Sequence, residues 1–164
     1  MSNEIETLLK RVQLLEDKQA ITELKYRYFK GLDMREPETV RDIFDPNGCI
    51  IDFGEWGRFD NVDDFVKVFI SEECQPHVLD THHGHNIRIT VTGEDTAEGR
   101  VDLHHGQVRT DNRTVAHETC YYNEKYIRHS GRWWIKELRF FIYNEVVYSV
   151  EEDGSLKIKV LGKA

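Results

Sequence analysis

Histidines are the residues of this chain whose spacing could support acid–base chemistry. Five of the eight lie in two short clusters: His82, His83, His85, His104 and His105. The unperturbed pKa of an imidazole is about 6.5, so a histidine can exchange protons near neutral pH. Both clusters fall in stretches where polar and apolar residues alternate, which is typical of β-strands.

The alternation predicts which histidines can meet. Side chains two residues apart share one face of a strand, so His83 and His85 point the same way, and His105 shares a face with Val101 and Leu103. If these faces line a cavity, His85 and His105 can meet across neighbouring strands. The competing interpretation is a hydrogen-bonded structural histidine. We favour that interpretation for His82, His83 and His104.

A metal site is the main chemical alternative. His83, His85 and His105 with Glu118 would supply three imidazoles and a carboxylate, the set used by cupin-like metal centres. Cupins are all-β proteins, whereas this chain opens with about 70 residues of mainly helical pattern. We therefore expect no metal and no other cofactor.

The elements that must position these residues follow from the periodicity. Apolar residues recur every three or four positions up to Leu32, which predicts an amphipathic helix that ends near Asp33 and bends at Asp17. Residues 1–16 would form a helical arm. We expect this arm to pack on its own domain, because about two heptads make a short coiled coil.

Two short helices and a β-meander are expected after this helix. The helices begin near Pro37 and Asn61, where proline and a side-chain cap suit a first turn. Beyond Asp80 the period changes to two, with strands predicted over 97–109, 115–128, 132–143, 146–150 and 156–161. Helices followed by strands indicate an α+β fold in which the helices cover one face of a curved, mainly antiparallel sheet.

Composition limits the classes of partner and compartment. The chain has 164 residues, which suits a single domain over 1–164. Its net charge of −8 argues against a nucleic-acid partner. Neither a signal sequence nor a membrane span is evident, and three widely spaced cysteines suggest no disulfide framework. We expect a cytoplasmic protein that acts on a small molecule.

Five stretches together carry a family resemblance over nearly the whole chain. They are Leu15–Ile21, Tyr28–Asp33, His82–Ile87, Asp95–Arg100 and, after Tyr126, Gly131–Ile135. In order and spacing the chain resembles the SnoaL-like group of the NTF2-like superfamily, near the bile acid 7α-dehydratases. Scytalone dehydratase and a hexachlorocyclohexane dehydrochlorinase are more distant relatives.

The resemblance implies a cone-shaped sheet around a pocket, cofactor-free lyase or isomerase chemistry, and a homo-oligomer, either a trimer or a dimer. It places a catalytic tyrosine and aspartate on Tyr28 and Asp33, and the catalytic histidine on His85. The second histidine of scytalone dehydratase falls on His105, where the bile acid enzymes carry a carboxylate.

These residues form one functional hypothesis. His85 would be a general base whose Nδ1 proton is accepted by Asp33, while His105 and Tyr28 assist a leaving group or an enolate. A carboxylate at a helix C-terminus opposes the helix dipole, which favours a functional interpretation of Asp33.

The predicted substrate contacts come from alternate positions of the later strands and from the first histidine cluster: Tyr122, Arg139, Phe141, Tyr143 and His83. A cation among aromatics, as at Arg139, can bind an enolate-like oxygen. We expect a dehydratase-like lyase for a small cyclic or steroid-like hydrophobic substrate. The alternatives are a non-catalytic binding or assembly domain, and an isomerase or epoxide hydrolase in the same pocket.

Overall fold

The computed structural model of the protein describes residues 2–162. The helices are α1 (Ser2–Asp33), α2 (Pro37–Arg41) and α3 (Val62–Glu72), with a 3₁₀ turn, η1, at Gly54–Trp56. The strands are β1 (Ile50–Asp52), β2 (Arg58–Phe59), β3 (Val78–Val91), β4 (Thr96–Arg109), β5 (Thr114–His129), β6 (Arg132–Val150) and β7 (Leu156–Leu161). The predicted α+β class is confirmed.

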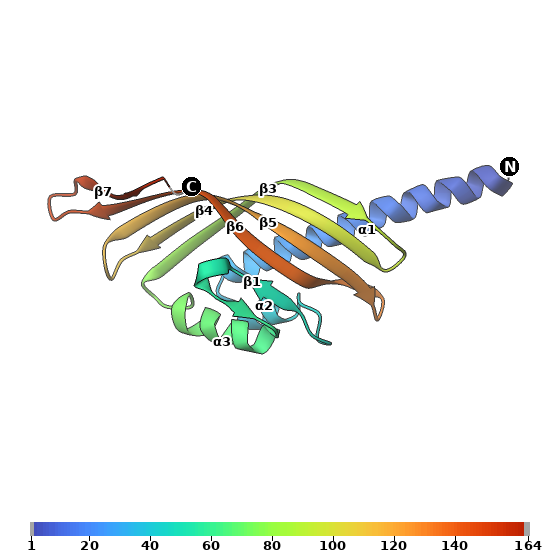
Figure 1. The fold of residues 1–164 in the computed structure, drawn as a ribbon, viewed down its shortest axis with the longest axis horizontal. Helices are drawn as coiled ribbons and strands as arrows, with labels where there is room; N and C mark the ends of the chain where they lie inside the picture. Colours follow the sequence, from blue (N-terminus) through green and yellow to red (C-terminus); the bar gives the residue numbers. More distant parts are fainter. Residues whose placement is uncertain (1, 163–164) are drawn as a thin grey trace.

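The seven strands of the described residues form one open sheet. Its order is β2-β1-β6-β5-β4-β3, and β7 pairs with the last part of β6. Strands β3 to β6 form the antiparallel meander that the sequence predicts, whereas β1 runs parallel to β6. The sheet is strongly curved, with α1 running along it and α2, α3 and β1 gathered beneath (Figure 1). This is the expected cone-like arrangement.

Helix α1 is continuous, so the predicted bend at Asp17 is wrong. Asp17 is buried and accepts hydrogen bonds from Arg128 Nη1 at 2.7 Å and Trp133 Nε1 at 3.1 Å. Because its carboxylate bonds to the sheet, it does not cap a second helix. The short α3 does begin as predicted, since Asn61 Oδ1 accepts a hydrogen bond from the Asp64 amide at 2.9 Å.

The first half of α1 does not pack on its own domain, contrary to our expectation. Residues 2–16 extend clear of the sheet (Figure 1), and the apolar side chains on this arm are exposed. The second half packs along β3, with Ile21, Leu24, Tyr28, Phe29 and Leu32 in the core.

Gly84 allows this close packing of α1 on β3. A Cβ atom at Gly84 would run into the ring of Phe29. The missing side chain therefore lets the helix approach the strand closely where Asp33 must reach across.

A β-bulge in β3 divides the strand into two halves: even-numbered side chains face the concave side before the bulge, and odd-numbered ones face it after the bulge. The pairing of β3 with β4 shifts between His85 and Arg88, and Asn86 has a positive φ of 50°. Before the bulge, even-numbered residues such as Asp80, His82 and Gly84 face the concave side. After it, Ile87 and its odd-numbered successors pack against the core. A bulge adds one residue to one strand, which is why the alternation reverses.

Strand β6 is also longer than predicted, running through the expected break at Tyr143 to Val150. Its pairing with β5 shifts at two places, between Thr119 and Cys120 and between Lys125 and Tyr126 on the β5 side. The shift between Lys125 and Tyr126 keeps Phe140 on the buried face and puts its neighbours Arg139 and Phe141 on the opposite face.

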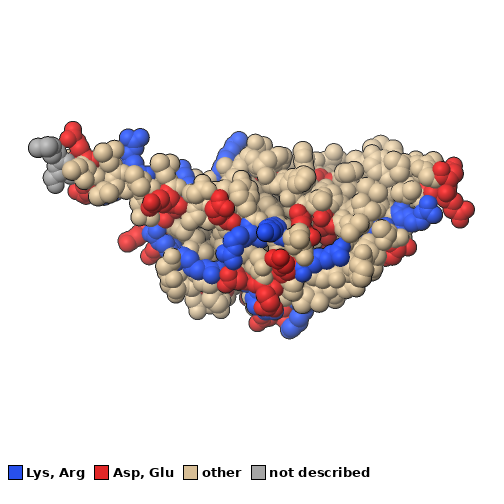
Figure 2. Space-filling model, turned by 180° about the vertical axis from the view of Figure 1, so that it is seen from behind, with Lys and Arg blue, Asp and Glu red and all other residues tan. Residues whose placement is uncertain are grey.

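The surface is mixed in charge. Acidic and basic side chains are interspersed over the face seen in Figure 2, rather than gathered into one positive patch. No helix within residues 2–162 is long and apolar enough to cross a membrane.

Candidate active site

A cavity of about 440 Å³ lies between the concave face of the sheet and the segment from β1 to α3. Aromatic residues form much of its wall: Tyr28, Phe53, Trp56, Phe59, Phe65, Phe69, Tyr122 and Phe140. Polar residues gather on one side, near the ends of α3, β3, β4 and β5 and on β6: Glu73, Asp80, His82, His105, Gln107, Arg109, Thr114, Glu118 and Glu145. A mainly apolar cavity with a few convergent polar groups is typical of a small-molecule site.

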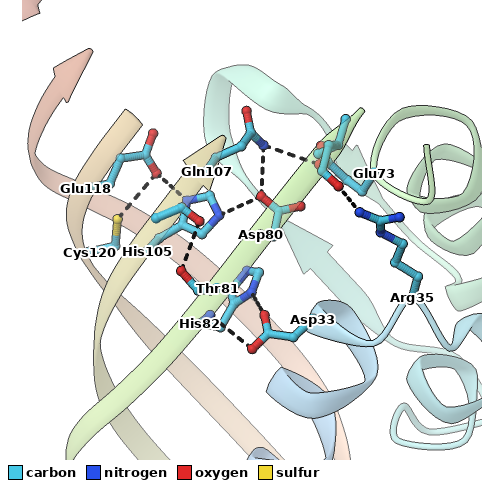
Figure 3. Close-up of polar contacts among 12 residues, drawn as sticks. Asp33, Arg35, Glu73, Asp80, Thr81, His82, His105, Gln107, Glu118 and Cys120 are labelled. Atoms are coloured by element: carbon cyan, nitrogen blue, oxygen red, sulfur yellow. Dashed lines mark hydrogen bonds and ion pairs between the residues drawn. The ribbon is translucent and has the colours of Figure 1, made fainter. Parts of the chain in front are cut away.

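His82 and Asp33 form the closest pair at this polar side. His82 Nδ1 lies 2.7 Å from Asp33 Oδ1, and the His82 backbone amide donates to Asp33 Oδ2 at 3.3 Å (Figure 3). Asp33 is the last residue of α1, and this double contact offsets the unfavourable dipole at a helix C-terminus. When Nδ1 is protonated and donates a hydrogen bond to Asp33, Nε2 is the ring nitrogen that can accept a proton.

His105 lies beside His82, held between two carboxylates. Its Nδ1 is 3.0 Å from Glu118 Oε2, and its Nε2 is 3.2 Å from Asp80 Oδ1 (Figure 3). The rings of His82 and His105 are 4.6 Å apart, because the two residues face each other in the β3–β4 pairing. With both nitrogens donating to carboxylates, His105 is best described as an imidazolium.

The two imidazoles are tuned in opposite directions. Burial lowers the pKa of His82, and the nearby charge of His105 lowers it further, against the hydrogen bond to Asp33. Burial alone would also lower the pKa of His105, but the hydrogen bonds to Asp80 and Glu118 raise it to about 9. At neutral pH the pair therefore combines a neutral imidazole with a charged one, which is the pattern of separated acid–base roles.

Glu73 extends the cluster from the C-terminal end of α3. Burial raises the pKa of Glu73 to about 7, and the charge of Asp80 adds to this effect. Gln107 bridges the two, with its Nε2 donating to Asp80 Oδ1 at 3.0 Å and to Glu73 Oε2 at 3.3 Å (Figure 3). A carboxyl with this pKa can hold or release a proton near neutral pH, and Glu73 lies in the same cavity.

Tyr28 and Tyr122 line the cavity next to a buried ion pair. Tyr28 is fully buried, and within residues 2–162 its hydroxyl has no hydrogen-bond partner of good geometry. Burial raises the pKa of Tyr28 far above its ordinary value, so the hydroxyl stays a donor. Lys25 Nζ lies 3.6 Å from the Tyr122 ring centroid and 2.7 Å from Glu124 Oε1. This pair supports the tyrosines from behind the cavity.

The structure brings together only part of the predicted site. Tyr28, His105 and Tyr122 line the cavity, and Asp33 touches it through His82. The expected contact between Asp33 and His85 is wrong, since the bulge after His85 leaves that side chain outside the cavity. His85 packs against His104 instead, with ring centroids 4.6 Å apart.

The remaining predicted substrate contacts also lie outside the cavity. His83 is exposed on the strand face opposite His82. Arg139 pairs with Glu137, while Phe141 and Tyr143 pack against Tyr121 on the outer face of the sheet. The register shifts in β6 explain this error, because simple alternation put these residues on the Tyr122 face.

The proposed metal ligands are divided in the same way. His105 and Glu118 are in contact, whereas His83 and His85 lie away from them. Among residues 2–162, no group of three or more histidine, cysteine, aspartate or glutamate side chains has the arrangement of a metal site.

Sequence reasoning missed His82, Asp80, Glu73 and Gln107. For His82 a signal was present at Asn86, because asparagine tolerates the positive φ that interrupts a strand. Two residues of a strand on either side of such a bulge cannot be assigned to one face by counting. No local pattern marks Glu73, whose place depends on how α3 meets the sheet.

The fold and site together define an NTF2-like pocket protein, with a helix packed along a curved sheet around a cavity. Within that class the chain belongs to the SnoaL-like domain family, whose model matches residues 13–139. The match runs from Gln13, within the arm of α1, to Arg139 in β6, and it includes every polar residue of the cavity lining except Glu145.

Solved structures share this fold at low sequence identity. A protein from Novosphingobium aromaticivorans provisionally named a scytalone dehydratase is 21% identical, with a TM-score of 0.74 over 83% of this chain and 89% of its own. A hexachlorocyclohexane dehydrochlorinase, LinA type 2, is 15% identical, with a TM-score of 0.76 over 94% and 97%.

A third structure carries a different name. It is a protein from the same Novosphingobium species, provisionally named an aromatic ring hydroxylase, with 19% identity and a TM-score of 0.70 over 78% of this chain and 90% of its own. One fold thus carries proteins named for different reactions, and chemistry must be argued from the side chains.

Proposed function

We propose that the protein is a cofactor-independent lyase that eliminates water from a small, neutral, hydrophobic cyclic substrate. The observation that carries the proposal is the Asp33–His82 pair, which opens on a mainly aromatic cavity beside a second, charged histidine. The names of two structural neighbours, a dehydratase and a dehydrochlorinase, both refer to elimination reactions.

His82 is the general base in this proposal, in place of His85. Its Nε2 removes a proton from a carbon next to a carbonyl, and Asp33 holds Nδ1 and stabilises the imidazolium that forms. The electron pair of the broken C–H bond forms the new double bond as the bond to the β-hydroxyl breaks. The proton moves to His82, and the electrons leave with the hydroxyl.

Three other residues complete the step. The positive charge of His105, which the hydrogen bonds to Asp80 and Glu118 hold in place, stabilises the negative charge that develops on the substrate. Tyr28 donates a hydrogen bond to the substrate carbonyl. Glu73, with a pKa of about 7, gives its proton to the departing hydroxyl, which leaves as water.

The cavity supports a neutral substrate. Its lining includes Glu73, Asp80 and Glu118, so an anionic group would meet carboxylates along with His105 and Arg109. The aromatic wall instead favours an apolar ring system. Steroid-like and smaller cyclic hydroxyketones are the members of this class to test first.

The test uses proton abstraction and water loss together. The protein is incubated in D₂O with a panel of cyclic β-hydroxyketones, and mass spectrometry records both loss of water and deuterium uptake next to the carbonyl. His82→Gln should lower both rates by about 10²–10⁴-fold, the usual contribution of a general base. His85→Gln is the matched control, with the same chemical change outside the cavity, and should retain the wild-type rate.

The outcomes separate the alternatives. Deuterium uptake with a shifted double bond, and no water loss, would indicate an isomerase that uses the same base. Retention of a ligand with unchanged mass in wild type would favour a binding domain. Loss of activity in His85→Gln, with full activity in His82→Gln, would place the base outside this cavity and overturn the proposal.

A further inference from the structure

The exposed arm of α1, residues 2–16, carries an apolar stripe that its own domain leaves uncovered. Ile5, Leu8, Val12 and Leu15 are between 49% and 67% exposed. They recur at intervals of three and four residues, and Leu9 lies beside them, 64% exposed. Four large apolar side chains in a row on a projecting helix are unusual for a surface that faces only water.

The stripe lies on the opposite side of α1 from the face that packs on the sheet. At about 100° per residue, the arm stripe is centred roughly 180° around the helix from Ile21, Leu24 and Tyr28. Bending the arm toward its own sheet would therefore not bury it. Past the arm, this side of the helix carries polar or exposed residues such as Gln19, Glu23 and Arg27. Apart from Tyr26, which is 47% exposed, the apolar stripe is confined to the arm.

The residue types along the stripe match those of one kind of helix pair. Ile5 and Val12 fall at the first apolar position of consecutive heptads, and Leu8 and Leu15 at the second. In parallel coiled coils, β-branched residues at the first position with leucine at the second favour two strands. The stripe is thus complementary to itself.

Charges beside the stripe fit a parallel pairing of identical chains. In such a pair, Arg11 of one helix faces Glu16 of the other, and the two-fold axis makes this contact twice. Both side chains are exposed on the arm. An antiparallel pair centred on the arm would instead bring the two copies of Arg11 together, which is unfavourable.

We propose that the arm is a homodimerisation element, in which the stripe of Ile5, Leu8, Val12 and Leu15 pairs with the same stripe of a second copy as a parallel two-stranded coiled coil. Figures 1 and 2 show the arm standing clear of the body, where a second helix can approach it. The helix needs no separate nucleation, because it continues into the packed half of α1.

Light scattering after gel filtration, over a range of concentrations, tests the surface. Wild type should be a dimer, and the double variant Leu8→Glu/Val12→Glu should raise the dimer dissociation constant at least 100-fold. Thr7→Glu introduces a similar carboxylate about 120° around the helix from the stripe and should remain dimeric. The thermal unfolding temperature of the double variant at high dilution should match that of wild type, since these side chains do not touch the core.

Cysteine cross-linking tests the orientation. Val12→Cys should form a disulfide-linked dimer under mild oxidation, because a parallel pair places residue 12 opposite itself. Thr7→Cys should stay uncross-linked, which also controls for the native cysteines. A monomeric or trimeric wild type, a double variant that remains dimeric, or equal cross-linking at both positions would overturn the proposal.

Discussion

The charge state of His105 is the prediction on which the proposed chemistry depends most. A pKa of about 9 in the folded protein compares with an ordinary value of 6.5. At about 1.4 kcal/mol for each pH unit, this difference corresponds to about 3 kcal/mol of stability. Because the folded-state pKa is raised, the contribution is complete below pH 6.5 and is lost as the pH rises through 9.

Nuclear magnetic resonance of ¹³C-labelled histidine measures this pKa directly, with the His105 signal assigned by its loss in His105→Gln. Wild-type His105 should titrate near 9. Glu118→Gln removes one of its two carboxylate partners and should lower the value by about 1–2 pH units, the usual effect of one adjacent opposite charge.

Stability provides an independent measure of the same quantity. The free energy of unfolding of wild type minus that of His105→Gln should fall by about 3 kcal/mol as the pH rises from 6.5 through 9. For a chain of this length, that is a loss of about 6–12 °C in unfolding temperature. Taking the difference removes the titration of Lys25, which is common to both proteins.

A His105 pKa of about 6–7, the ordinary range for histidine, would refute the reasoning. A His105 pKa that does not change in Glu118→Gln would refute it as well. Either result would mean that burial lowers the pKa of His105 at least as much as the two carboxylates raise it. His82 would then lose the charged neighbour that adds to the effect of burial in lowering its pKa.

Three further predictions concern the scaffold. Glu124→Gln should cost about 3–5 kcal/mol in chemical denaturation, because it leaves the buried charge of Lys25 unpaired, whereas replacing both by apolar residues should restore much of the loss. Asp42→Asn breaks contacts that are half exposed and should cost less than about 1 kcal/mol in the same measurement. Gly84→Ala should cost about 1–3 kcal/mol by forcing Phe29 to move, and an unchanged stability would show that α1 is not tightly seated on β3.

The parts of the fold that could be predicted are those governed by local periodicity. The α1 residues from Ile21 to Leu32 repeat at helical spacing, and the strands after Asp80 alternate, so the helix-then-sheet order followed directly. The resemblance to the SnoaL-like group added the cone and the cavity; Tyr28 lines that cavity, and Asp33 reaches it through its contact with His82. These features do not depend on the register between strands.

The errors come from non-local contacts. Asp17 looked like a helix cap, but its partners Arg128 and Trp133 lie more than a hundred residues away and keep the helix straight. His85 looked like the partner of Asp33 because alternation was carried through Asn86. Register changes of one residue reverse the face of every side chain beyond them.

The bulge that hid His82 is also what allows β3 to serve the cavity and the core at once. The polar residues Asp80 and His82 stand at even positions, and the apolar residues Ile87 and Ile89 stand at odd ones, yet both pairs lie on the concave side of the sheet. A regular strand could present only one of these pairs there. The extra residue at Asn86 reconciles them, so one half of the strand lines the cavity and the other half packs against the core. The cavity wall therefore depends on a departure from ideal strand geometry, which is why counting along an ideal strand placed His85, and not His82, at the cavity beside Asp33.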